Sequence, residues 1–163
     1  MITLVLGGAR SGKSELAERL VARSGQAVTY VATGMATDPE MAARIAAHRI
    51  RRPPAWKTVE AEEDLAGVVS DLSGSVVVDS LGTWLARLDG FEGDFLRLAT
   101  ALAARPGDTV VVSDEVGLGV HPSTEVGRQF RDALGRLNRT VADAADEVLL
   151  VVAGRVIRME EMI

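Results

Sequence analysis

Short apolar runs rich in β-branched residues recur along the chain as ITLVL (2–6), AVTYVA (27–32), SVVVDS (75–80), DTVVVS (108–113) and EVLLVVAG (147–154). Within each run the apolar residues are largely continuous and do not alternate with polar ones. This pattern is typical of strands covered on both faces, as in a parallel sheet that lies between two layers of helices. The runs therefore predict strands of a mostly parallel sheet.

The segments between these runs show the period of an α-helix. KSELAERLVARS (13–24) places Leu16 and Leu20 on one side, and TEVGRQFRDALGRLNRTVADAA (124–145) repeats apolar residues at helical spacing. Strands that alternate with helices indicate a doubly wound α/β domain. Because the chain is long enough for one substantial core and short for two, we assign residues 1–163 to a single domain.

The C-terminal stretch VVAGRVIRM predicts a departure from the parallel arrangement. Its first half continues the last strand, Ala153 and Gly154 form a tight turn, and the second half returns as a short antiparallel strand. The chain contains no internal repeat, low-complexity tract or linker that would suggest another unit. The expected architecture is a mostly parallel sheet that ends in a C-terminal antiparallel hairpin.

The composition fits a globular protein and excludes several kinds of site. Hydrophobic residues make up 47% of the chain and charged residues 25%. The absence of cysteine excludes disulfides, thiolate metal sites and cysteine nucleophiles, and two histidines are too few for an ordinary zinc centre. The net charge of -5 argues against a broad contact with a phosphate backbone, so we expect no nucleic-acid partner.

Targeting and membrane signals are absent from the pattern. No apolar run approaches the roughly 20 residues that a membrane-spanning helix needs. The N-terminal stretch MITLVLGGARSGKS has no basic segment ahead of its apolar one, as a secretory signal would. We therefore expect no membrane span and a cytoplasmic location.

The stretch GGARSGKS (7–14) carries the strongest signal for function. It fits G-x-x-x-x-G-K-[ST] through Gly7, Gly12, Lys13 and Ser14, and it lies between a predicted strand and a predicted helix, as the motif requires. The glycines let backbone N–H groups surround phosphate oxygens, Lys13 would bridge the β- and γ-phosphates, and the Ser14 hydroxyl would hold Mg²⁺. The motif predicts a P-loop NTPase-like domain that binds a nucleoside triphosphate. It does not show what is done with the triphosphate.

Two acidic residues near the ends of buried strands are candidates for the metal site. Asp79 in VVVDS could complete a Mg²⁺ site with Ser14, and Glu115 in VVVSDEVG is a second candidate. Both lie at carboxyl ends of strands, which form the rim where doubly wound sheets bind ligands. A helix cap or a solvated loop acid is the alternative interpretation of each.

The stretch TDPEMAARIAAHRIRRPP (37–54) predicts a helix that begins at Thr37 or Asp38 and ends before Pro53. Residues at intervals of three or four share one face of this helix, which changes from apolar to cationic along its length. They are Met41, Arg44, Ile45, His48 and Arg52. Arginines at positions 49, 51 and 52 crowd the C-terminal end and would repel one another unless an anion lies among them.

His48 can be interpreted in two ways. A neutral imidazole is a good nucleophile near neutral pH because its unperturbed pKa is about 6.5. Its attack on the α-phosphorus of a nucleotide would form a phosphoramidate, and the arginines would stabilise the charge on the transferred group. Alternatively, the imidazole and the arginines clamp a phosphate without covalent chemistry. The residues alone leave both interpretations open.

Blocks along nearly the whole chain resemble one known family. They are GGARSGKS, YVATG (30–34), DPEMAARIAAHRIRRPPAWKTVE (38–60), VVVDSLGTWL (76–85), VSDEVGLGVHP (112–122) and GRQFRDALGRLNRTVADAADEVLLVVAG (127–154). Together they resemble the bifunctional adenosylcobinamide kinase / adenosylcobinamide-phosphate guanylyltransferase family. The most specific block is the helix with M-x-x-R-I-x-x-H followed by R-P and W-x-T-x-E, which generic P-loop kinases lack.

The resemblance implies an enzyme of cobalamin biosynthesis with two activities, which uses Mg²⁺ and takes ATP and GTP as substrates. It would phosphorylate the aminopropanol hydroxyl of adenosylcobinamide with ATP or GTP. It would then transfer GMP from GTP to the new phosphate through a guanylyl-histidine and release pyrophosphate. By resemblance the covalent histidine is His48, the partner is a corrinoid substrate, and the protein is a homotrimer.

The resemblance also implies a set of nucleotide-binding residues. They are Gly7, Gly8, Ala9, Arg10, Ser11, Gly12, Lys13, Ser14, Ala32, Thr33, Gly34, Arg49, Ile50, Arg51, Arg52, Glu60 and Gly82. His48 and Lys13 would be catalytic, and Ser14 and Asp79 would hold the metal. The chain departs from the family pattern at Asp114, where Asn is expected, and at His121, where an aliphatic residue is expected.

Two other functions are compatible with the P-loop. One is an ordinary small-molecule kinase, in which His48 only helps to clamp a phosphate. The other is a regulatory ATPase, in which hydrolysis drives a change of shape. Trp56 and Trp84 could stack on a ligand, but core packing is the stronger expectation for both.

Overall fold

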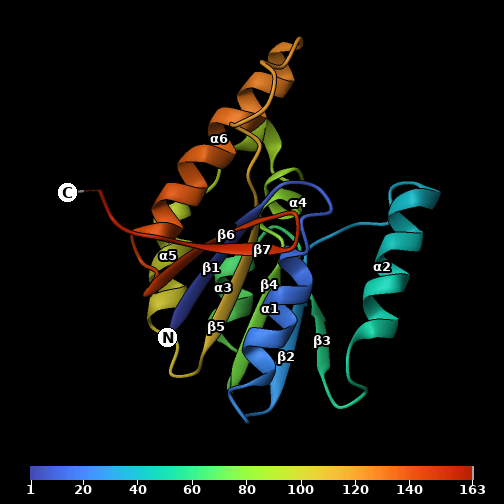
Figure 1. Cartoon of the computed structure of the whole chain (residues 1–163), viewed down its shortest axis with the longest axis vertical. Coiled ribbons are helices and arrows are strands. Elements are labelled where there is room, and N and C mark those ends of the chain that lie inside the picture. The colour runs from blue at the N-terminus through green and yellow to red at the C-terminus, as the bar shows by residue number, and fades with distance from the viewer. Residues whose placement is uncertain (163) are drawn as a thin grey trace.

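The structure is a computed structural model that describes residues 1–162, apart from the side chain of Arg44, so the last residue of the predicted domain lies outside it. Strands and helices alternate along the chain (Figure 1). The strands are β1 (Ile2–Gly7), β2 (Val28–Ala32), β3 (Lys57–Glu60), β4 (Ser75–Asp79), β5 (Thr109–Asp114), β6 (Glu147–Val152) and β7 (Arg155–Met159). The helices are α1 (Lys13–Ala22), α2 (Pro39–Arg51), α3 (Leu65–Ser70), α4 (Leu81–Leu85), α5 (Phe95–Ala103) and α6 (Glu125–Ala142), with a 3₁₀ turn at Asp89–Phe91.

The strands form one sheet in the order β3-β2-β4-β5-β1-β6-β7. Every neighbouring pair is parallel except β6 and β7, which are antiparallel. Ala153 and Gly154 take positive φ angles of 49° and 70° in the turn between these two strands, as a two-residue hairpin requires. The structure thus confirms the predicted α/β class, the mostly parallel sheet and the C-terminal hairpin, with strand ends shifted by no more than two residues.

The sheet is buried on both faces, which explains the continuous apolar runs. Side chains alternate along each strand, so that in β1 Leu4 and Leu6 pack on one face and Val5 on the other. The first face is covered by α3, α4, α5 and α6, and the second by α1. Trp84 is 4% exposed within the first core and Trp56 packs against the second, so the expectation of core packing is confirmed for both.

The short edge strand β3 was not predicted, because its sequence KTVE is polar and mostly exposed. It pairs in parallel with β2, which places Thr58 beside Tyr30 and Glu60 beside Ala32. Tertiary pairing with a neighbouring strand, rather than an apolar pattern, stabilises it. Through this pairing, β3 brings the residues that follow α2 in the chain back to the rim of the sheet.

Helix α2 projects from the side of the molecule and belongs to neither core (Figure 1). The Asp38 side chain caps it by accepting a hydrogen bond from Met41 N at 2.8 Å, so the predicted start lies at Asp38 and not at Thr37. Extended backbone at Arg52 ends it, immediately before Pro53. Of its described side chains the least exposed are Met41, Ile45 and His48 of the predicted shared face, with Arg52 buried just beyond the end. The Arg44 side chain, predicted on the same face, lies outside the described part of the structure.

A buried arginine lies at the end of the sheet opposite to the carboxyl ends of the strands. Arg105 is 9% exposed, and its guanidinium donates to the carbonyl oxygens of Val69 (2.9 Å), Leu72 (2.5 Å) and Gly74 (2.7 Å) and to Thr109 Oγ1 (3.0 Å). Burial lowers the pKa of this guanidinium.

Within residues 1–162, no helix combines the length and the apolar character needed to cross a membrane.

Candidate functional site

The loop between β1 and α1 forms a cradle at the carboxyl end of the sheet. Gly12 has a φ angle of 98°, a conformation that favours glycine, and no side chain caps the helix that begins at Lys13. The first N–H groups of α1 therefore lack intrahelical acceptors and carry a partial positive charge. They face a hollow of about 680 Å³, which is lined by residues 9–15 and by residues of α2 that include His48. This is the geometry of a phosphate-binding site.

Lys13 of this loop is held by an acidic residue from a neighbouring strand. Its ammonium is 4% exposed, donates to Gly8 O at 3.1 Å and lies 2.8 Å from Asp114 Oδ1. Parallel pairing of β1 with β5 places Gly7 level with Asp114, which explains how the two residues meet. Asp114, the departure from the family pattern, thus occupies a position beside the ammonium where a phosphate oxygen would bind.

Asn138 holds the backbone of Asp114, and Gly82 leaves room for its side chain. Asn138 Nδ2 donates to the backbone oxygen of Asp114 at 3.1 Å, and Ser113 Oγ donates to Asn138 Oδ1 at 2.6 Å. Gly82 leaves room for the carboxylate, because a Cβ atom at position 82 would lie 2.5 Å from Asp114 Oδ2. Gly82 therefore lies beside Asp114, the partner of Lys13.

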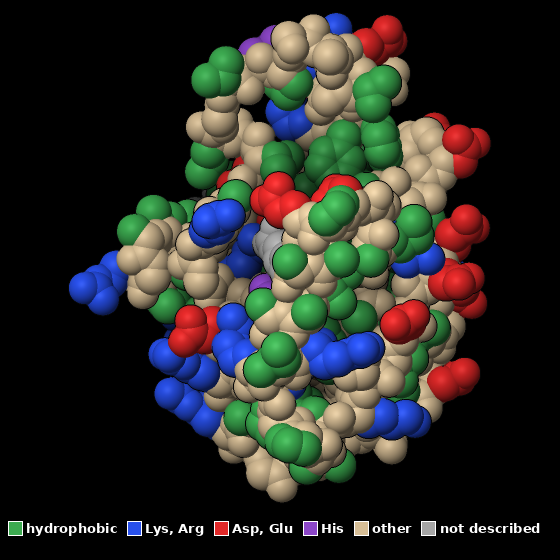
Figure 2. All heavy atoms as spheres, turned by 90° about the vertical axis from the view of Figure 1, so that its right-hand side faces the viewer, with side chains coloured by type: hydrophobic (Ala, Val, Ile, Leu, Met, Phe, Trp, Pro, Cys, Tyr) green, Lys and Arg blue, Asp and Glu red, His purple; other side chains and the backbone are tan. Residues whose placement is uncertain are grey.

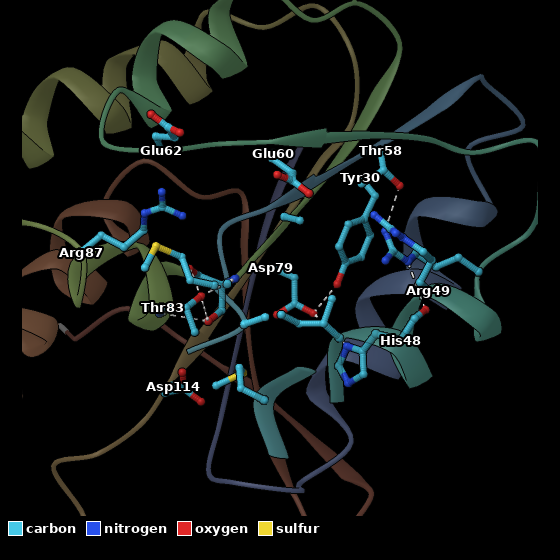
Figure 3. Close-up of a pocket in the computed structure, with 18 of the residues that line it drawn as sticks. Tyr30, His48, Arg49, Thr58, Glu60, Glu62, Asp79, Thr83, Arg87 and Asp114 are labelled. Atoms are coloured by element: carbon cyan, nitrogen blue, oxygen red, sulfur yellow. Dashed lines mark hydrogen bonds and ion pairs between the residues drawn. The ribbon is translucent and has the colours of Figure 1, made fainter. Parts of the chain in front are cut away.

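A second polar cluster surrounds Asp79 at the end of β4. The Tyr30 hydroxyl donates to Asp79 Oδ2 at 2.7 Å, and His48 Nδ1 lies 3.7 Å from the same oxygen (Figure 3). Burial alone would raise the pKa of the Asp79 carboxyl, but polar contacts with His48, Tyr30 and Ser14 outweigh it, and the net shift is downward. Burial and the adjacent Asp79 charge raise the pKa of Tyr30. Asp79 is therefore ionised and Tyr30 is protonated. The Tyr30 hydroxyl and the His48 imidazole both face Asp79 Oδ2.

A cavity of about 570 Å³ runs over this cluster, and Lys13 and Asp114 line it together with Asp79 and His48. It continues to Glu60, Glu62 and Arg87, which lie on the far side of Asp79 from His48 (Figure 3). Met35, Met41 and Ile45 give it apolar surface. His48 lines both this cavity and the hollow of the loop, so its imidazole stands where the two meet. Lys and Arg side chains gather over the lower part of the face that carries α2 (Figure 2), which suits a polyanionic ligand.

The three arginines near the end of α2 have different partners. Arg51 donates two hydrogen bonds of 2.8 Å to Glu18 of α1, and these bonds raise its pKa. Arg52 lies over the Tyr30 ring, 3.8 Å from its centroid, and lines the cavity together with Arg49. The Glu18 carboxylate thus supplies negative charge beside Arg51, and a bound anion among the arginines stays a prediction. Successive residues of a helix point about 100° apart, and the carboxylate of α1 and the ring of β2 lie where two of the arginines point.

The other predicted nucleotide-binding residues divide into two groups. Ala32, Gly34 and Glu60 line the cavity. Thr33 is fully buried and bonds to Ser80 and Thr83, so it joins β2 to the turn before α4. Ile50 is 85% exposed and lines neither cavity.

Ser14 and Asp79, the predicted metal ligands, lie close enough for Ser14 to lower the pKa of Asp79. Glu115, the alternative candidate, instead accepts a hydrogen bond from Gly117 N at 2.6 Å and lines neither cavity. Among the described residues no group of three or more His, Cys, Asp or Glu side chains could hold a metal alone. One hydroxyl and one carboxylate beside a phosphate cradle fit Mg²⁺, which usually takes one or two protein ligands and completes its shell with water and substrate phosphates.

Several residues of the site were missed by the sequence analysis. Tyr30 and Thr58 belong to strands whose pairing brings them together, and Met35 and Arg87 come from loops beside the cavity. The only available signal was for Tyr30, the one tyrosine of the chain, which interrupts a buried apolar run with a hydroxyl. A buried hydroxyl needs a hydrogen-bond partner, but the partner could not be named without the fold.

Comparisons with known proteins agree with the resemblance of the sequence blocks. A family model described as cobinamide kinase / cobinamide phosphate guanyltransferase matches residues 3–159. The bifunctional adenosylcobalamin biosynthesis protein CobP of Pseudomonas aeruginosa is 43% identical, with 94% of each chain covered. The protein CobU of Escherichia coli, which has the same description, is 40% identical over 94% of this chain and 97% of its own. Among solved structures, the RadB recombinase is similar in fold, with a TM-score of 0.51 and 19% identity over 91% of this chain and 73% of that chain.

Proposed function

The chain belongs to the cobinamide kinase / cobinamide phosphate guanyltransferase family, and we propose that it carries out both reactions in adenosylcobalamin biosynthesis. It phosphorylates adenosylcobinamide with ATP or GTP, and then transfers GMP from GTP to the new phosphate through a guanylyl-histidine. The products of the second reaction are adenosylcobinamide-GDP and pyrophosphate. The observation that carries this proposal is the position of His48, whose imidazole lines both the hollow of the phosphate cradle and the cavity over Asp79.

In the kinase step the loop 7–14 holds the triphosphate through its backbone N–H groups and the open end of α1. Lys13 exchanges Asp114 for the β- and γ-phosphates and stabilises charge on the transferred group. Ser14 and Asp79 would hold Mg²⁺, which when bound neutralises negative charge on the phosphates. Phosphoryl transfer depends mainly on positioning and electrostatics, so the step requires no dedicated general base.

In the guanylyl step His48 displaces pyrophosphate from the α-phosphorus of GTP. The phosphate of the substrate then displaces His48, which divides one difficult displacement into two. Arg49 and Arg52 line the cavity at the end of α2 and would stabilise the phosphate charge. We assign Ala32, Gly34 and Glu60, on the cavity wall, to nucleotide contacts. Arg51 lines the hollow of the loop, but its guanidinium is bound to Glu18, so we assign it to support of α2, as we assign Thr33 to support of β2.

The remaining features of the proposal rest on resemblance to the family. The cavity of about 570 Å³ is open and far smaller than a corrinoid, which fits a substrate that lies partly outside one chain. We infer a homotrimer in which a subunit interface helps to bind the corrinoid. We also infer a cytoplasmic enzyme, built as one nucleotide-binding domain.

A labelling experiment tests the guanylyl-histidine. The protein is incubated with Mg²⁺ and GTP labelled at the α-phosphate, and covalent label that survives base and is lost in acid is expected, as for a phosphoramidate. His48→Asn should abolish the label and leave γ-phosphoryl transfer to adenosylcobinamide largely intact. His121→Asn, which changes the other histidine of the chain, is the matched control and should label normally.

The same experiment separates the competing functions. An ordinary kinase would transfer γ-label to adenosylcobinamide with no label on the protein, and a regulatory ATPase would hydrolyse nucleotide without phosphorylating a small molecule. Equal loss of labelling and γ-transfer in His48→Asn would show that His48 supports the structure. Any of these results would contradict the proposal.

A further inference from the structure

The two ring nitrogens of His48 have different surroundings. Nδ1 lies 3.7 Å from Asp79 Oδ2, on the side of the cavity. Nε2 has no hydrogen-bond partner among the described side chains, which exclude that of Arg44, and the ring also lines the hollow of the phosphate cradle. A carboxylate beside one nitrogen of an imidazole favours a proton on that nitrogen and leaves the lone pair on the other. The arrangement around Asp79 therefore distinguishes the two nitrogens.

The position of Asp79 is set by a circuit of contacts that returns to His48. The Tyr30 hydroxyl donates to Asp79 Oδ2 at 2.7 Å, and the Tyr30 ring lies under the guanidinium of Arg52 at 3.8 Å. Arg52 in turn donates to the backbone oxygen of His48 at 3.1 Å. Arg52 is 9% exposed and Tyr30 is 3% exposed, so the backbone oxygen of His48 contacts one buried side chain. The imidazole of His48 faces Asp79, to which the other buried side chain, Tyr30, donates (Figure 3). The circuit orients the imidazole relative to the phosphate cradle.

We propose that Asp79 and Tyr30 are positioning residues that hold His48 with its proton on Nδ1, so that GMP is carried on Nε2. The inference rests on the proposed guanylyl transfer and extends it to the atom that forms the bond. Tyr30 orients the carboxylate, and the carboxylate orients the ring. This assigns a role to the one tyrosine of the chain and to the Asp79 oxygen that it contacts.

The transfer balances without a net movement of protons. The lone pair of Nε2 attacks the α-phosphorus of GTP, an N–P bond forms, and the bond from this phosphorus to the bridging oxygen breaks with loss of pyrophosphate. The proton stays on Nδ1, where the Asp79 carboxylate stabilises the positive ring. The phosphate of the substrate then attacks the same phosphorus, the N–P bond breaks, and its electron pair returns to Nε2.

The site of the bond can be identified directly. The protein is labelled with ¹⁵N-histidine, guanylylated with GTP and Mg²⁺, and examined at alkaline pH by through-bond ¹H–¹⁵N correlation, which identifies the ring nitrogen that carries phosphorus. The spectrum is simple because the chain has two histidines. Attachment at Nε2 is expected. Attachment at Nδ1 would overturn this inference and leave the guanylyl-histidine intact, whereas no adduct in the wild-type protein would overturn the proposed function and this inference with it.

Tyr30→Phe tests the circuit. It removes the hydroxyl and keeps the ring under Arg52, so the single-turnover rate of His48 guanylylation should fall by about tenfold, the size expected for one hydrogen bond to a charged group. GTP affinity and γ-phosphoryl transfer should both change less than guanylylation, because the hydroxyl reaches them only through Asp79, the proposed Mg²⁺ ligand, whereas His48 takes part in the guanylyl step alone. Thr100→Val, which removes an exposed hydroxyl on α5, is the control. Wild-type guanylylation in Tyr30→Phe, or equal slowing of both reactions in a folded variant, would refute the positioning role.

Discussion

Asp114→Asn should make the empty protein less stable and its nucleotide binding tighter. The substitution restores the residue that the family pattern has at this position and removes the negative charge 2.8 Å from the Lys13 ammonium. The asparagine oxygen can still accept a hydrogen bond, so the change isolates the charge. Lys13 is then left with the Gly8 carbonyl oxygen and a neutral amide as acceptors.

The size of the effect follows from the burial of the pair. Breaking a buried ion pair costs about 3–5 kcal/mol, and breaking an exposed one costs about 0–1 kcal/mol. Lys13 is 4% exposed and Asp114 is 29% exposed, which places this pair between the two limits. We therefore expect a loss of about 2 kcal/mol in the free energy of unfolding without nucleotide. On the proposed mechanism, phosphate oxygens of the bound nucleotide contact Lys13 in both proteins, so the same energy should appear as roughly thirtyfold tighter nucleotide binding.

Urea unfolding followed by circular dichroism measures the first quantity, and calorimetric titration with a non-hydrolysable ATP analogue and Mg²⁺ measures the second. Asp71→Asn is the matched control, since it makes the same change of charge at an exposed position at the end of α3. Weaker nucleotide binding in Asp114→Asn would refute the reasoning, because it would mean that the carboxylate supports the bound metal rather than competing with phosphate. Unchanged stability would show that the ion pair contributes nothing to the empty protein.

Arg105→Leu should lower the free energy of unfolding by about 3–5 kcal/mol, because it strands buried carbonyl oxygens at the end of the sheet opposite to the site; a loss below about 1 kcal/mol in urea unfolding would contradict this. In a double-mutant cycle, Arg51→Gln and Glu18→Gln should couple by about 1 kcal/mol in unfolding, a modest value because Arg51 is 40% exposed, and neither should weaken GTP binding by more than about twofold. A large loss of GTP affinity in Arg51→Gln alone would instead show that Arg51 contacts nucleotide. Chelation of Mg²⁺ should stop both γ-transfer and His48 labelling without changing the melting temperature of the nucleotide-free protein, since the described residues offer no site that holds a metal alone; a shifted melting temperature would indicate a structural metal.

Features that depend on local chemistry could be predicted from the sequence. The buried strands follow from continuous β-branched runs, the phosphate cradle from glycine and lysine spacing, and the start of α2 from a capping aspartate before proline. The shared face of α2 also follows, because its period is set by helix geometry alone. The edge strand β3 could not be predicted, because its polar sequence becomes a strand only by pairing with β2.

The sequence by itself therefore determined the fold class, the phosphate cradle and the presence of a histidine on a helix face that becomes cationic. Only the tertiary structure decided which side chains meet. Tyr30 and Asp79 are 49 positions apart, yet they share a hydrogen bond because parallel pairing of β2 and β4 brings their carboxyl ends to one rim. Lys13 meets Asp114 for the same reason, through β1 and β5. The register between strands is a property of the whole sheet, since it depends on how both faces are packed, and no local pattern in the chain contains it.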